Sequence, residues 1–168
     1  MGKFARRAFV LIFCFLSCMS NLVVAAKVPS DESSDIQRFL TLRDKLQTNI
    51  KDPEKLKIQF SLGEYYFKIK AFREAKVAFD EIIQQNKGGI PALLANVYLY
   101  HLGQIKGKSS ESLLDLKKKI FADQFILLFD KYKTIQFTSP WGYDYEIHYF
   151  VDKIVVYRNG EVFEKITP

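Results

Sequence analysis

The chain has few of the residues from which disulfides and metal sites are built. Among its 168 residues there are 2 cysteines, Cys14 and Cys18, and 2 histidines, His101 and His148. Because both cysteines lie near the N-terminus, the rest of the chain can form no disulfide framework or cysteine metal site and must be held by its core. The histidines are far apart and no carboxylate cluster joins them. We therefore expect no metal and no cofactor.

Motifs for catalysis are also missing. The sequence contains no Gly-rich phosphate loop and no G-x-S-x-G nucleophile motif. Asp144, Glu146 and His148 alternate along one predicted strand, but a solvated polar strand face explains them better than acid-base catalysis does. The loop SPWGYD, residues 139–144, holds the only tryptophan. We interpret it as a packing corner in preference to a ligand-binding tip. We expect a protein that is not an enzyme.

Apolar and aromatic residues are plentiful. The composition is 48% hydrophobic, 26% charged and 15% aromatic, which is typical of one globular domain with a substantial core. Large flat side chains should therefore fill both the core and any binding surface.

Residues 1–26 are predicted to be an export signal. The basic segment MGKFARR precedes the apolar segment AFVLIFCFLSCMSNLVVAA, which ends in small residues suited to cleavage after Ala26. An uncleaved membrane anchor is the alternative, because the apolar stretch approaches the length that a bilayer requires. We expect an exported chain, periplasmic or secreted, followed by a flexible spacer over residues 27–34.

Two variants of this export signal are considered. Lipidation stays open, and the twin-arginine route is disfavoured. FLSC, residues 15–18, resembles a bacterial lipoprotein signal, which implies lipidation of Cys18. Arg6 and Arg7 resemble a twin-arginine signal, but the very apolar segment after them favours the general secretory route. Membrane attachment is thus expected only through Cys18 or an uncleaved signal.

The net charge gives little support to nucleic-acid binding. The formal charge is +6, and removal of Lys3, Arg6 and Arg7 with the signal leaves +3. Much of the basic character therefore belongs to the signal.

Residues 35–133 are predicted to form a helical region. Apolar side chains recur every three or four positions, and Asp35, Pro53, Pro91 and Ser109 or Ser110 are typical helix starts. Glycines and tight connections separate the segments. The predicted helices cover residues 35 to about 49, 52 to 69, 72 to 85, 91 to about 103, and a long one from 109 or 110.

Residues 134–168 have a different pattern. Short runs rich in β-branched and aromatic residues indicate an antiparallel meander, and Asn159-Gly160 is a strong hairpin signal. The alternation over residues 143–151 places one set of side chains on a packed face. This set is Tyr143, Tyr145, Ile147, Tyr149 and Val151. We expect an α+β protein whose small sheet packs on the last helix.

One helical pair resembles the tetratricopeptide repeat, a 34-residue helix-turn-helix unit. The resemblance rests on Leu62, Gly63 and Tyr66 followed by Phe72, Ala75 and Phe79, and Leu94, Ala95 and Tyr98 repeat its first half. The aromatic that usually starts the first helix is replaced by Gln59, and a bland helical hairpin has the same periodicity. Small Gly63 and Ala75 should let the two helices approach closely.

The resemblance implies a concave groove for a protein or peptide partner. By the matched spacing, the groove residues are Lys57, Phe60, Glu64, Phe67, Lys68, Asn96 and Tyr100. Aromatic side chains would supply buried area and the polar ones would align a peptide. The alternatives are a structural accessory subunit that makes its contact through the β meander, and a small secreted enzyme with a pocket joining His148 to Trp141.

Overall fold

The computed structural model describes residues 30–85, 89–128 and 134–168. The predicted signal and residues 27–29 of the predicted spacer lie outside this part of the chain. The chain divides into two units at residues 33 and 34, and the second unit, residues 34–168, contains every element below except the start of the first helix.

The described residues form five helices followed by a four-stranded sheet, which confirms the α+β class. Helix α2 begins five residues before the predicted cap Asp35, so residues 30–34 are helical and the spacer prediction is wrong for them. The helices are α2 (Ser30–Leu46), α3 (Asp52–Lys68), α4 (Phe72–Gln85), α5 (Ile90–Ile105) and α6 (Ser110–Leu128).

Local sequence explains where the helices begin. Pro53 and Pro91 lie in the first turns of α3 and α5, where a proline ring fixes the helical φ and no intrahelical N–H is lost. Between α3 and α4 the chain reverses through Lys70, whose φ of 61° is left-handed. These breaks start α3, α4 and α5 within one residue of the predicted positions.

Helices α3 and α4 approach closely at Gly63. A Cβ atom on Gly63 would lie 2.6 Å from Cε1 of Phe79, and both residues are buried. The close approach of the two helices predicted at Gly63 is therefore confirmed. Gly103 of α5 has the same role against α6, since its Cβ would lie 2.4 Å from Cδ2 of Leu113.

We expect Gly63→Ala to lower the free energy of unfolding by about 2 kcal/mol, because the new methyl group overlaps the Phe79 ring. At an uncrowded helical site the same change would raise the free energy of unfolding by about 1 kcal/mol, because alanine has a higher helix propensity than glycine. Urea unfolding measures the difference. A gain in stability would show that α3 and α4 are further apart than described.

The sheet is an antiparallel meander in chain order, as predicted. Asn159 and Gly160, with φ of 53° and 80°, make the two-residue turn between the last two strands, because both positions need a left-handed backbone. The strands are β1 (Thr134–Thr138), β2 (Asp144–Tyr149), β3 (Ile154–Arg158) and β4 (Glu161–Ile166).

The alternation in β2 is confirmed except at its ends. Tyr145, Ile147 and Tyr149 are buried, and Tyr143, just before the strand, is half-buried. Val151 is fully exposed, so its predicted place on the packed face is wrong. The reason is that the strand ends at Tyr149 and Val151 lies in the turn to β3.

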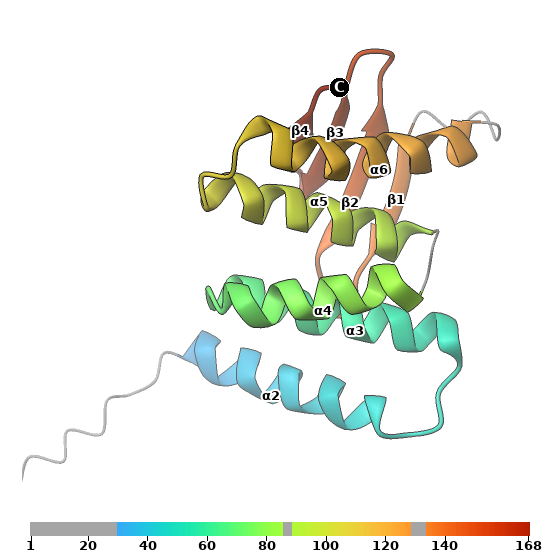
Figure 1. Ribbon diagram of the computed structural model, residues 1–168. Helices are drawn as coiled ribbons and strands as arrows, with labels where there is room; N and C mark the ends of the chain where they lie inside the picture. Colours follow the sequence, from blue (N-terminus) through green and yellow to red (C-terminus); the bar gives the residue numbers. More distant parts are fainter. Residues whose placement is uncertain (1–29, 86–88, 129–133) are drawn as a thin grey trace, which may run out of the picture. The chain divides into compact units, whose positions relative to one another are not determined.

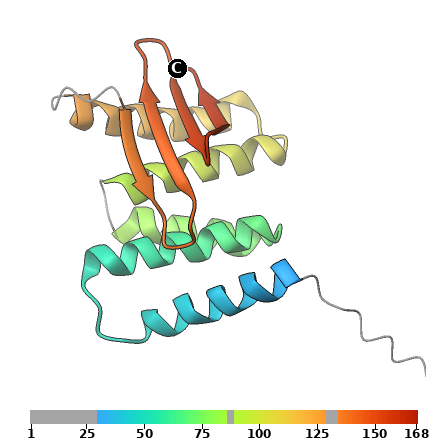
Figure 2. The ribbon, with the colours of Figure 1, turned by 180° about the vertical axis from the view of Figure 1, so that it is seen from behind.

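The sheet lies on one side of the helices, over α5 and α6, as the two opposite views show (Figures 1 and 2). Its inner side chains share one core cluster with α3, α4, α5 and α6. The prediction placed the sheet on the last helix, α6, but its rings also pack on α3 and α5: Phe137 and Tyr145 contact Phe60, and Phe163 contacts Tyr98. Large aromatic side chains on α3 and α5 provide this additional apolar surface.

Candidate functional site

The helix face predicted to be the partner groove is covered by the chain's own sheet. The ring of Phe60 lies 5.9 Å from that of Phe137 and 6.0 Å from that of Tyr145, centroid to centroid. The rings of Tyr98 and Phe163 are 4.7 Å apart. Side chains of α3 and α5 thus already have partners from β1, β2 and β4.

A buried polar network joins the two layers beneath these rings. The Tyr145 hydroxyl donates to Oε1 of Glu64 at 2.5 Å, and the Tyr98 and Tyr145 oxygens are 2.6 Å apart. Because Tyr145 has one hydroxyl proton, the Tyr98 hydroxyl must donate to the Tyr145 oxygen. Arg158 Nη1 donates to the Tyr98 oxygen at 3.1 Å. This series of hydrogen bonds, from Glu64 through Tyr145 and Tyr98 to Arg158, therefore links α3 and α5 to β2 and β3.

Burial dominates the electrostatics of this network. It raises the pKa of Glu64 from 4.5 to about 7, although hydrogen bonds from Tyr145, Ser139 and Ser61 and the charge of Arg158 act to lower it. Burial also raises the pKa of Tyr98 and of Tyr145. A carboxyl group with this pKa could serve as an acid or base in an open cleft, but Glu64 is only 1% exposed. Its position is that of a structural group.

The seven predicted groove residues do not form one accessible surface. Phe60, Glu64, Asn96 and Tyr100 are buried, so the prediction that they contact a partner is wrong for this arrangement. The physical reason is that the sheet and α6 fill the space in front of them. Asn96 donates to the Ala92 carbonyl oxygen in its own helix.

The other three predicted residues are more accessible. Phe67 is half-buried and packs against Tyr98, His101 and Phe163. Lys68 is exposed and pairs with Asp35 of α2. Lys57 is exposed and lines a surface hollow near the start of α3. It therefore stays a candidate partner-binding residue.

The Trp141 loop is a packing corner, as favoured by the sequence. Trp141 is buried. Its backbone N–H donates to Ser61 Oγ at 3.0 Å, and its backbone carbonyl oxygen accepts from Arg38 Nη1 at 2.5 Å. The Tyr65 ring packs on it at 5.2 Å. The loop therefore fastens the β1–β2 turn to α2 and α3.

Each histidine has a carboxylate neighbour but no wider cluster. His101 Nδ1 lies 2.6 Å from Glu164 Oε2, and His148 Nε2 lies 3.2 Å from Glu146 Oε2. His148 also packs against Phe150 and Tyr157, whereas Trp141 packs against Tyr65 and Arg38. In the described ranges, no group of three or more His, Cys, Asp and Glu side chains could hold a metal ion.

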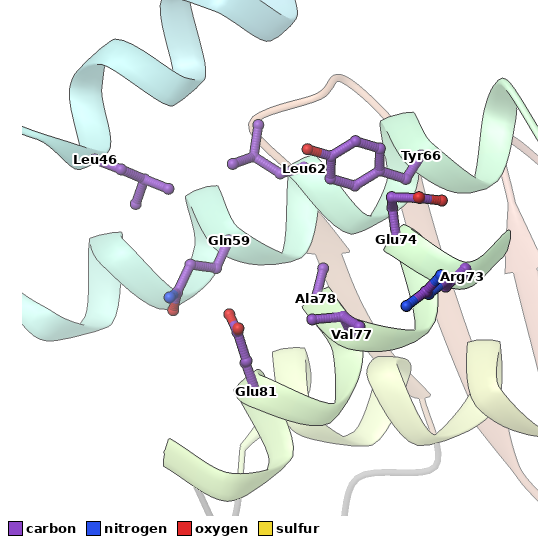
Figure 3. Close-up of a pocket in the computed structure, with 9 residues that line it drawn as sticks. All are labelled: Leu46, Gln59, Leu62, Tyr66, Arg73, Glu74, Val77, Ala78 and Glu81. Atoms are coloured by element: carbon purple, nitrogen blue, oxygen red, sulfur yellow. The ribbon is translucent and has the colours of Figure 1, made fainter. Parts of the chain in front are cut away.

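An open hollow of about 500 Å³ lies between α2 and α4, with α3 as its floor (Figure 3). We call it the outer hollow. Its apolar lining is Leu46, Leu62, Val77 and Ala78, with Tyr66 at one side. The sequence pattern did not predict this hollow, although Leu62 and Tyr66 belong to the repeat-like pattern.

Charged groups stand at the edge of the outer hollow. Arg73, Glu74 and Glu81 come from α4, and none of them makes an ion pair with another described residue. Val77 between them is 52% exposed, which is unusual for a valine on a helix that packs on two others. The outer hollow therefore combines an apolar lining with charges that have no ion-pair partner among the described residues.

Comparisons with protein-family models, curated proteins and solved structures give no significant match. The resemblance to the tetratricopeptide repeat and the export signal therefore stay predictions from the sequence. In the part of the chain that the structure describes, no helix is both long enough and apolar enough to span a bilayer.

Proposed function

We propose that the chain is a non-catalytic exported protein that binds a protein partner as a scaffold or assembly factor. The contact proposed here is the outer hollow, in place of the inner groove that the repeat resemblance implies. The observation that carries the proposal is the open apolar lining between α2 and α4, beside charges that have no ion-pair partner among the described residues.

The chemistry of the outer hollow defines the partner segment. Its floor accepts a large apolar side chain, and such anchors supply most of the binding energy at protein interfaces. Glu74 and Glu81 outnumber Arg73 at its edge, so charge complementarity favours a segment with a basic residue next to its apolar anchor. The export part of the proposal rests on residues 1–26 of the sequence.

A structural accessory subunit is the second candidate, because the turn between β2 and β3 has exposed apolar side chains. Phe150 is 43% exposed and Val151 has no cover at all. A partner of this kind would dock on the hairpin turn and leave the outer hollow empty.

Site-specific photo-crosslinking in the protein's own cells distinguishes these proposals. A photoreactive residue at Val77 is expected to give a crosslinked partner in the envelope fraction, whereas the same residue at exposed Lys118 of α6 gives none. Crosslinks from Val151 without any from Val77 would favour the accessory subunit. Absence of crosslinks from both valines would contradict partner binding.

A further inference from the structure

A second hollow, of about 530 Å³, lies where α2 is followed by α3 and the β1–β2 turn closes one side. Three lysines from different segments line it: Lys45 from α2, Lys51 from the connection and Lys57 from α3. We call it the basic hollow. Glu54 is its single acidic lining residue, so three positive charges oppose one negative charge.

The three lysines have no ion-pair partner among the described carboxylates, Glu54 included. All three are exposed. Lysines elsewhere in the chain do have carboxylate partners, since Lys68 pairs with Asp35 and Lys76 pairs with Asp80. The basic hollow thus keeps a positive potential that an anionic ligand can use.

Four apolar residues also line the basic hollow. Leu42 and Ile58 lie at its base and are 5% and 2% exposed, and Pro53 and Pro140 also line it. The two hydroxyl groups on its border are engaged, since Thr138 Oγ1 donates to Asp144 and Ser139 Oγ accepts from the Tyr143 N–H. The three ammonium groups are therefore the main donors that the basic hollow offers to a ligand.

This arrangement fits an acidic peptide better than a phosphate or a lipid headgroup. A compact phosphate is bound best by convergent donors such as a guanidinium fork or clustered backbone N–H groups. No arginine lines the basic hollow, and in the first turn of α3, which borders it, Pro53 has no N–H and the Glu54 N–H donates to the Lys51 carbonyl oxygen. Lysines on three segments around an apolar base instead match several separate carboxylates that flank an apolar side chain.

We propose that the basic hollow binds an acidic segment of a protein, with an apolar side chain between its carboxylates. This proposal rests on the proposed function, and it specifies that one segment of the bound protein is acidic. It uses a site separate from the outer hollow, so the crosslinking experiment at Val77 and the peptide experiment below can fail independently.

The test uses the purified chain and a fluorescent peptide of alternating Glu and Leu. A variant with Lys45→Glu, Lys51→Glu and Lys57→Glu is compared with a control that carries Lys118→Glu, Lys119→Glu and Lys165→Glu. The control lysines are exposed and lie outside the basic hollow. Both variants change the net charge equally, and thermal unfolding checks that both are folded.

We expect the hollow variant to bind the peptide at least tenfold more weakly than the control variant, and added salt to weaken binding to the native chain. A second variant, with Gln at the three hollow positions, should also lose affinity. Equal loss in hollow and control variants would overturn the proposal. So would equal binding of a peptide with Gln for Glu, or binding of inorganic phosphate or phosphatidylglycerol vesicles in preference to the acidic peptide.

Discussion

Phe60→Ala is expected to lower the free energy of unfolding by about 4 kcal/mol. The side chain has no exposed surface, and its ring contacts Phe79, Tyr98, Phe137 and Tyr145 at centroid distances of 5.7 to 6.0 Å. Truncation therefore leaves a cavity where α3 meets both α5 and the sheet. Urea unfolding at constant pH measures the loss.

Phe150→Ala is the matched control for that experiment. Phe150 is 43% exposed in the turn after β2, so the same chemical change should cost less than about 1 kcal/mol. If Phe60→Ala cost no more than the control, the Phe60 ring would be an open surface group, as the groove prediction had it. A large loss only at Phe60 identifies it as part of the core.

Stability is expected to fall as the pH rises from 4.5 to 7, by about 3 kcal/mol from Glu64 alone. Burial raises the pKa of Glu64 from 4.5 to about 7. In that interval the unfolded chain has released the proton while the folded chain still holds it, so the folded state binds more protons and raising the pH destabilises it. Below pH 4.5 both states are protonated, and above pH 7 both are ionised, so the change levels off.

Glu64→Gln isolates this effect, because glutamine keeps the acceptor for the Tyr145 hydroxyl and does not ionise. The variant should match the native chain near pH 4 and be up to about 3 kcal/mol more stable at pH 8. Glu161→Gln, an exposed substitution on β4, corrects for the general effect of losing a carboxylate. Parallel stability curves for Glu64→Gln and the native chain would contradict the buried position of Glu64.

Most of the element boundaries could be predicted because they are set by local chemistry. Pro53 and Pro91 start helices, and Asn159-Gly160 fits a two-residue turn with left-handed backbone at both positions. The close approach at Gly63 also followed from sequence spacing. The end of β2 did not, because alternation continues through Val151 while the backbone has already turned.

The candidate site could not be predicted because it depends on which surfaces cover each other. Periodicity identified Phe60 and Glu64 as residues of one helix face, but it gave no information about what lies against that face. The partner of Glu64 is Tyr145, 81 residues away. The basic hollow likewise joins α2 and α3 to the β1–β2 turn, a contact that no local pattern contains.

The central claim is that the chain's own sheet covers the inner face of α3 and α5. Nuclear Overhauser spectra of the native chain test it directly, through cross-peaks between aromatic ring protons. We predict cross-peaks from Phe60 to Tyr145 and from Tyr98 to Phe163, alongside the helix-to-helix cross-peak from Phe60 to Phe79. Helix-to-helix cross-peaks without any from helix to sheet would show an open groove and contradict the claim.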